Sequence, residues 1–125
     1  MVDSGPILAI GDTACRLDEI GDPGAREFRL ATSRGPRSIF VVRSGGRVFG
    51  YMNLCPHEAA TLDIAPDEFL TEDGASIECA MHGARFRIED GVCVEGPCLG
   101  EELALVPLRV DEGHVVIDPR WWWKP

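Results

Sequence analysis

The chain has 125 residues, enough for one domain with one hydrophobic core. Twelve Lys and Arg against 21 Asp and Glu give a net charge of −9, which argues against nucleic acid and anionic membranes as partners. No apolar run approaches the ~18 residues that a membrane helix needs, and the N-terminus has no apolar stretch like that of a signal peptide. We therefore expect a soluble, cytoplasmic protein.

The chain is rich in turn residues, with 14 Gly and nine Pro, at a spacing typical of an all-β sandwich or barrel. The first predicted strand holds Cys15, which we expect in the core. Helical periodicity is weak, and its best case is a short turn near residues 65–68. Further short strands are predicted over residues 26–32, 38–43, 47–54, 75–79, 84–89, 92–95, 103–110 and 114–118. The predicted turns between them include Arg34-Gly35-Pro36, Ser44-Gly45-Gly46, Glu89-Asp90-Gly91 and Asp111-Glu112-Gly113.

Two short segments carry the chemistry: Cys55-Pro56-His57 and Cys79-Ala80-Met81-His82. Each follows a predicted strand and supplies one thiolate and one imidazole, so together they could form a metal site. A free Cys is often only a small buried apolar residue, but two Cys-His pairs on two loops are hard to explain by packing alone. Structural zinc also takes two Cys and two His, usually with the two Cys close together and the two His close together. Here the residue types are mixed within each loop.

The pattern C-x-H followed by C-x-x-H resembles the fingerprint of the Rieske [2Fe–2S] family. The resemblance implies one [2Fe–2S] cluster, with Cys55 and Cys79 on the inner iron and His57 and His82 on the outer iron. It also implies an antiparallel β-sandwich or barrel base, residues 1–46 and 98–125, with a smaller β cluster-binding subdomain inserted at about 47–97. Further matches to the family lie at Leu62, Gly83, Phe86, Asp90-Gly91 and Gly96-Pro97.

The departures from the family pattern indicate which kind of Rieske protein this is. Ala59 and Thr61 stand where the family often has Gly and Pro. Ala60 and Met81 stand where the subunits of cytochrome complexes carry disulfide-forming cysteines. Ala84 and Phe86 replace the Ser and Tyr whose hydroxyls hydrogen-bond sulfur in those subunits. Since such bonds stabilise the reduced cluster, the sequence predicts a potential toward the low end of the Rieske range, about −150 mV.

By resemblance the chain is a Rieske-type ferredoxin, a one-electron carrier with no catalytic residues of its own. Its expected partners are a flavin-dependent ferredoxin reductase and an oxygenase or other oxidoreductase. A Rieske oxygenase needs a further iron on two His and a carboxylate, and only His114 remains, for which we expect an ordinary surface or packing role. Two alternatives stay open: a Rieske-like small subunit of a larger, nitrite-reductase-type enzyme, and a structural Cys2His2 zinc module. The sequence leaves the oligomeric state open.

Three further features of the sequence each allow two interpretations. Residues 48–84 contain no Lys or Arg but seven acidic residues, either a solvated face or an acidic docking face for a basic partner. Cys93 and Cys98 flank Gly96-Pro97 and are either two packed thiols, which we favour, or a labile disulfide. The triplet Trp121 to Trp123 is either a docking surface or a tail folded over the sandwich.

Overall fold

The computed structural model describes residues 6–56, 61–62, 67–80 and 83–118. These residues form β-strands, one 3-10 turn and no α-helix, as the all-β prediction requires. None of their helical segments is long and apolar enough to cross a membrane. The elements in chain order are β1 (Ile7–Leu8), β2 (Thr13–Arg16), η1 (Leu17–Glu19), β3 (Gly24–Thr32), β4 (Gly35–Ser44), β5 (Arg47–Met52), β6 (Ser76–Glu78), β7 (Arg85–Arg87), β8 (Cys93–Glu95), β9 (Leu105–Val106), β10 (Leu108–Asp111) and β11 (His114–Ile117).

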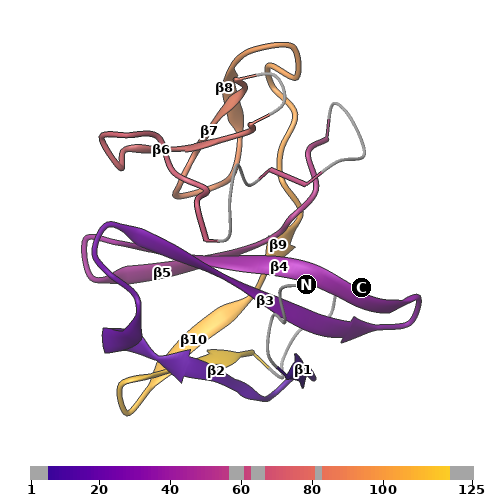
Figure 1. Ribbon diagram of the computed structural model, residues 1–125, viewed down its shortest axis with the longest axis vertical. Coiled ribbons are helices and arrows are strands. Elements are labelled where there is room, and N and C mark those ends of the chain that lie inside the picture. Colours follow the sequence, from indigo (N-terminus) through magenta and orange to yellow (C-terminus); the bar gives the residue numbers. More distant parts are fainter. Residues whose placement is uncertain (1–5, 57–60, 63–66, 81–82, 119–125) are drawn as a thin grey trace.

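The strands form three sheets, and Figure 1 shows them as two parts, one above the other. The lower part contains a five-stranded sheet, in the order β1-β3-β4-β5-β9, and a three-stranded sheet, in the order β10-β11-β2. The upper part consists of the sheet β6-β7-β8 and the segments that connect it to β5 and β9. None of the sheets closes into a barrel. All strand pairs are antiparallel except β1 with β3, a parallel pair that the sequence analysis did not predict.

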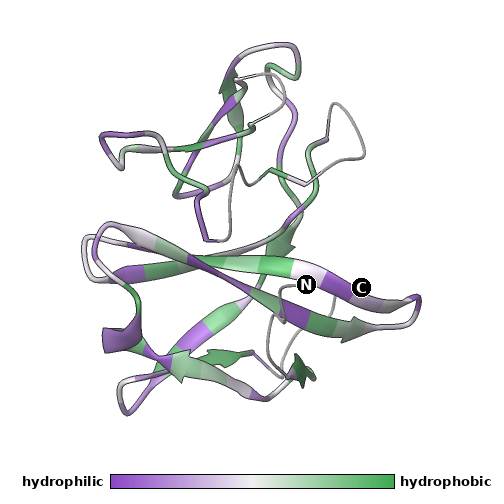
Figure 2. Ribbon diagram, viewed as in Figure 1, coloured by the Kyte–Doolittle hydropathy of each residue, from purple (hydrophilic) through white to green (hydrophobic). Residues whose placement is uncertain are grey.

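Strand β4 separates two hydrophobic cores, because alternate side chains of a strand point to opposite faces. Phe40 and Val42 pack into the upper core, whereas Ile39 and Val41 pack into the lower core. All four side chains are fully buried. The hydrophobic run of β4 is therefore the sequence signature of a strand covered on both faces. Figure 2 shows hydrophobic residues along the strands of both parts and hydrophilic residues at the hairpin ends.

The β3–β4 turn differs from its prediction. Thr32 pairs directly with Gly35, and Ala31 pairs with Pro36, so the connecting turn is Ser33-Arg34. Gly35 and Pro36 belong to the strand rather than to the turn. Turn-forming residue types mark the place of a hairpin, but strand register decides which residues form its loop.

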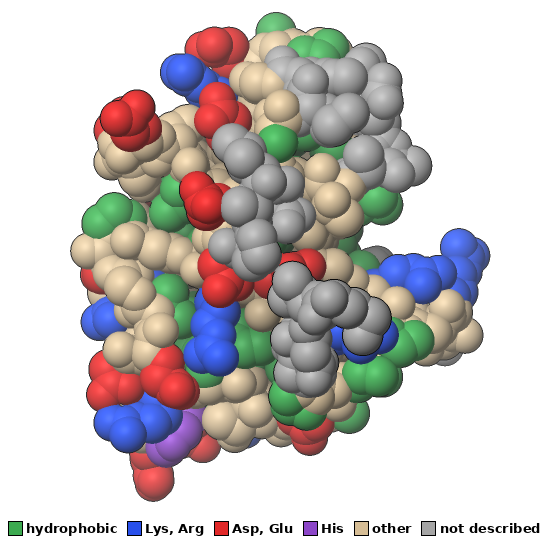
Figure 3. Space-filling view, viewed as in Figure 1, with side chains coloured by type: hydrophobic (Ala, Val, Ile, Leu, Met, Phe, Trp, Pro, Cys, Tyr) green, Lys and Arg blue, Asp and Glu red, His purple; other side chains and the backbone are tan. Residues whose placement is uncertain are grey.

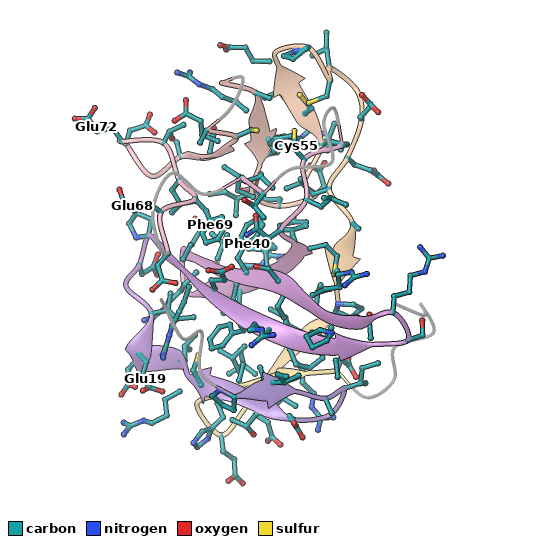
Figure 4. The ribbon with its side chains drawn as sticks, turned by 45° about the vertical axis from the view of Figure 1, so that its right-hand side comes forward. Glu19, Phe40, Cys55, Glu68, Phe69 and Glu72 are labelled. Atoms are coloured by element: carbon teal, nitrogen blue, oxygen red, sulfur yellow. The ribbon has the colours of Figure 1, made fainter. Side chains whose placement is uncertain are left out.

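The upper and lower parts are joined through aromatic side chains. The rings of Phe40 in β4 and Phe69 in the upper part stack with centroids 4.3 Å apart and planes 7° apart. Figure 4 shows these two rings meeting between the parts. Strand β5 pairs with both β4 and β9, and so belongs to the five-stranded sheet. We therefore propose that the inserted subdomain begins after Met52 rather than at about Arg47.

Candidate metal centre

Cys55 lies just beyond the end of β5, where the chain leaves the five-stranded sheet. The Asn53 N–H donates to the Ser38 carbonyl at 3.0 Å, and the Leu54 N–H donates to the Met52 carbonyl at 2.9 Å. These two bonds fix the direction in which the chain departs. Only 1% of Cys55 is exposed, so its thiol faces the upper core.

Cys79 follows β6 at the start of a tight turn. Its N–H donates to the Ala84 carbonyl at 2.8 Å, and its carbonyl accepts the Gly83 N–H at 2.9 Å. Gly83 has φ of +65°, a left-handed conformation that glycine adopts without the steric cost a side chain would bring. The Cys79 side chain is fully buried in the same core as Cys55.

Leu62 links the two cysteine segments through its backbone. Its carbonyl accepts the Ala80 N–H at 2.9 Å, next to Cys79. Its own N–H donates at 2.8 Å to Oδ1 of Asn53, next to Cys55 on the other side. The Asn53 amide nitrogen in turn donates to the Ser38 hydroxyl at 3.0 Å. That hydroxyl donates a hydrogen bond to the Glu27 carboxylate. The lower sheet therefore holds both segments in one network.

Gly96 packs closely against the segment that carries Cys79. It has φ of +109°, and a Cβ placed on it would lie 2.8 Å from Cα of Ala84. The loop can therefore approach the Cys79 turn this closely only because residue 96 has no side chain. The Gly96-Pro97 loop thus lies against the second cysteine segment.

Two residues that the sequence analysis did not single out hold this architecture. Asn53 is buried, with 4% of its surface exposed, although it lies in the mostly apolar run from Val48 to Leu54. Tyr51 is fully buried, and its hydroxyl donates to the Ile88 carbonyl at 2.5 Å. Burial raises the pKa of Tyr51, and the nearby Asp90 and Glu89 raise it further. A lone polar residue in an apolar run was the only sequence signal for Asn53.

The remaining cysteines are thiols in the structure. Cys15 lies in β2 and in the lower core, as predicted, and burial raises its pKa. Cys93 and Cys98 lie in the upper core, with their sulfurs 3.0 Å apart. Burial, followed by the hydrogen bond to Cys93, raises the pKa of the Cys98 thiol to about 12. The preferred prediction of two packed thiols agrees with this arrangement.

Several acidic side chains are exposed on the upper part. Asp67, Glu68, Glu72 and Asp73 are all exposed. Figure 3 shows Asp and Glu side chains spread over this part of the surface, with few Lys or Arg among them. Of the basic residues that follow, Arg85 lies 3.9 Å from the Glu95 carboxylate. Asp73 also has a structural role, since it accepts hydrogen bonds from Thr71 and Ala75, which lower its pKa.

His57 and His82 lie outside the described residues, as do Ala59, Ala60 and Met81. The predicted helical turn at 65–68 and the Trp triplet 121–123 also fall wholly or partly outside them. Among the residues that are described, no group of three or more His, Cys, Asp and Glu forms a metal site. The four-residue ligand set therefore stays a prediction. His114 is exposed at the start of β11, with Nδ1 3.1 Å from the Glu112 carbonyl, which agrees with a surface role.

The two buried thiols on two linked segments fit an iron–sulfur centre, since thiolates are the soft ligands that such clusters take. A family model of the Rieske [2Fe–2S] domain matches residues 13–112. The chain belongs to the Rieske family. A Rieske domain binds one [2Fe–2S] cluster, so the family match decides against the zinc alternative.

Similar proteins indicate the kind of Rieske protein. The ferredoxin component of an alkene monooxygenase system from Xanthobacter autotrophicus is 30% identical over 105 residues, covering 82% of this chain and 76% of the relative. The ferredoxin of Sphingomonas yanoikuyae B1 is 28% identical, with a TM-score of 0.65, covering 86% of this chain and 97% of that one. This Rieske protein is thus an electron carrier rather than an enzyme.

The fold also has a match among solved complexes. The solved complex of reduced oxygenase and oxidised ferredoxin in carbazole 1,9a-dioxygenase matches with a TM-score of 0.69 and 24% identity. The match covers 88% of this chain and 94% of that one. The arrangement of a three-stranded upper part on a two-sheet lower part is therefore that of known Rieske ferredoxins.

Proposed function

We propose that this Rieske protein carries single electrons from a flavin-dependent ferredoxin reductase to an oxygenase, through a cluster held by Cys55, His57, Cys79 and His82. The observation that carries the proposal is the pair of buried thiols on two hydrogen-bonded segments, Cys55 and Cys79. Each segment also supplies an imidazole, two residues after Cys55 and three residues after Cys79. When bound, such a cluster accepts and releases one electron, and its two imidazole ligands raise its potential above that of all-Cys clusters.

The upper core sets the environment of the cluster. Leu62, Ala84 and Phe86 are fully buried in it beside Cys55 and Cys79. None of these three side chains can donate a hydrogen bond to sulfur. Since such donors stabilise the reduced state, we predict a potential near the low end of the Rieske range, about −150 mV.

The similar proteins support the proposed electron acceptor, and the cysteines support the proposed compartment. Ferredoxin components of monooxygenase and dioxygenase systems are the relatives that this chain resembles, which supports an oxygenase as the electron acceptor. All five cysteines are thiols, although Cys93 and Cys98 are in contact, which suits a reducing cytoplasm.

The ligand set is tested on the purified holoprotein by iron and zinc analysis and by electron paramagnetic resonance after reduction with dithionite. We expect two irons per chain and the rhombic signal of a mixed Cys/His cluster. His57→Ala and His82→Ala should each remove the signal or alter its g values. His114→Ala is the matched control, because it removes the remaining imidazole at an exposed position in β11. An unchanged signal in His57→Ala or His82→Ala would overturn the ligand assignment.

The carrier role is tested separately by mixing the oxidised protein with a flavin-dependent ferredoxin reductase and NADH. Reduction is followed by the loss of visible cluster absorbance. A second mixing step with a Rieske oxygenase should restore that absorbance. If a loaded cluster exchanges electrons with neither class of partner, the ligand set would stand and the proposed partners would be wrong.

A further inference from the structure

Cys93 and Cys98 are not needed as cluster ligands, yet their sulfurs are in direct contact. Cys93 is the first residue of β8, and Cys98 lies in the turn that follows β8. The Cys98 Sγ donates to the Cys93 Sγ at 3.0 Å, and the Cys93 Sγ donates to the Glu95 carbonyl at 3.3 Å. A disulfide bond has its sulfurs about 2.05 Å apart, so a movement of about 1 Å would join them.

The backbone already closes the loop between these two cysteines. The Cys93 N–H donates to the Glu101 carbonyl at 2.7 Å, and the Gly100 N–H donates to the Cys93 carbonyl at 3.0 Å. The Glu101 N–H donates to the Cys98 carbonyl at 2.8 Å. Because these bonds hold both cysteines in place, bonding the sulfurs requires little further ordering of the chain.

The two cysteines are buried beneath an exposed loop. Only 2% of Cys93 and 1% of Cys98 are exposed. Their neighbours on the loop, residues 94–97 and 99–101, are all exposed. A small oxidant therefore needs only a local opening of this loop to reach the sulfurs.

The pair also adjoins the cluster region. Cys93 and Cys98 share the upper core with Cys55 and Cys79, and Figure 4 shows sulfur atoms gathered beside Cys55. Between the two cysteines, Gly96 lies against Ala84 of the second cysteine segment. A bond between Cys93 and Cys98 would therefore brace the loop that lies against the second cysteine segment.

We infer that Cys93 and Cys98 are a redox-active dithiol, which hydrogen peroxide oxidises to a disulfide that closes the Gly96-Pro97 loop. The Cys93 sulfur, which accepts the hydrogen bond from Cys98, attacks the peroxide oxygen and becomes a sulfenic acid while one water leaves. The other sulfur attacks the sulfenic sulfur, forms the S–S bond and releases the second water. The two thiols lose two electrons and two protons, and the peroxide becomes two waters. A small dithiol restores both thiols by exchange. The inference does not depend on which proteins exchange electrons with the cluster.

The test uses the wild-type holoprotein, prepared anaerobically and treated with one equivalent of hydrogen peroxide. Free thiols are then alkylated under denaturing conditions, and the chain is cleaved after glutamate. Cleavage after Glu95 separates Cys93 from Cys98, so a disulfide appears in the mass spectrum as two joined peptides that are lighter by two hydrogens. We expect this pair after peroxide, and its loss after dithiothreitol. The visible absorbance of the cluster should be retained throughout.

Hydrogen exchange gives a second readout that a packing role would not produce. The bond should slow exchange at the amides of Leu99, Gly100 and Glu101 after peroxide, because it suppresses local opening of the loop. The variant Cys98→Ser should show neither the joined peptides nor the slowing, and Cys93→Ser serves if that variant does not fold. Alkylated Cys93 and Cys98 after peroxide, or bleaching of the cluster before any disulfide forms, would overturn the inference.

Discussion

The side-chain oxygen of Asn53 accepts the backbone N–H of Leu62 at 2.8 Å, and this single bond joins the end of β5 to the segment between the two cysteine loops. The bond is buried, so water does not compete with either group for it. The Leu62 carbonyl in turn accepts the N–H of Ala80, which follows Cys79, so this second bond holds the Cys79 segment against Leu62. The position of Cys79 relative to Cys55 is thus set from the lower sheet.

Replacing Asn53 by Ala should leave the Leu62 N–H buried without an acceptor. We expect a loss of about 1–3 kcal/mol in unfolding free energy, together with faster loss of the cluster in the presence of an iron chelator. Denaturant unfolding and the decay of visible absorbance measure the two effects. Ser38→Ala is the control, because it removes a partner of the Asn53 nitrogen but keeps the bond to Leu62. Equal cluster loss in both variants would contradict this role of Asn53.

Replacing Gly96 by Ala should destabilise the loop beside the cluster. The new Cβ would lie 2.8 Å from Cα of Ala84, and φ of +109° disfavours any side chain. Gly100→Ala is a matched control, since its φ of +87° imposes similar backbone strain with no atom within 4 Å of the new Cβ. We expect about 1–2 kcal/mol of destabilisation in the control and a larger loss in Gly96→Ala, measured by denaturant unfolding. Equal losses would mean that backbone conformation alone accounts for Gly96.

Tyr51 should titrate only at strongly alkaline pH. It is the only tyrosine of the chain, so absorbance of phenolate near 295 nm reports this residue alone. Burial raises its pKa in the folded protein above the ordinary value of about 10. Its contribution to stability is therefore complete below about pH 10 and is lost as the pH rises from there toward the folded-state pKa.

Tyr51→Phe tests both the titration and the bond to Ile88. The variant should lose about 1–3 kcal/mol in unfolding free energy at neutral pH, because the Ile88 carbonyl is left buried without its donor. Its stability should also fall less than that of the wild-type protein as the pH rises above about 10, because it has no phenol to ionise. Phenolate formation in the wild-type protein near pH 10, without unfolding, would contradict the burial argument.

The acidic side chains of the upper part should speed association with a basic partner. Glu68→Gln combined with Glu72→Gln removes two exposed charges from this part and should lower the association rate roughly two- to tenfold at low salt. The rate should also depend less on ionic strength. Glu19→Gln is the control, because Glu19 lies at the opposite, lower end of the molecule in Figure 4. Stopped-flow reduction by a ferredoxin reductase measures the rates, and identical salt dependence in all three proteins would favour a merely solvated face.

Much of the fold could be predicted because its signals are local. The run around Phe40 and Val41 predicts a buried strand, and Gly45-Gly46 predicts the turn that follows it, where both residues have positive φ. The β3–β4 loop was misplaced, since register depends on pairing across the whole hairpin. The parallel contact of Ile7–Leu8 with β3 joins segments distant in sequence, so no local pattern could reveal it.

The sequence alone predicted a mixed Cys/His centre and its resemblance to the Rieske family, because the types of the proposed ligands and their spacing are local properties of Cys55-Pro56-His57 and of Cys79 to His82. Only the tertiary structure decided what holds those segments together. The Asn53 amide, the Gly96 contact with Ala84 and the meeting of Cys93 with Cys98 all depend on the folded path of the chain. Spacing along the chain predicts the ligands, whereas hydrogen bonds and packing between distant segments determine how Cys55 and Cys79 come to share one core and what surrounds them.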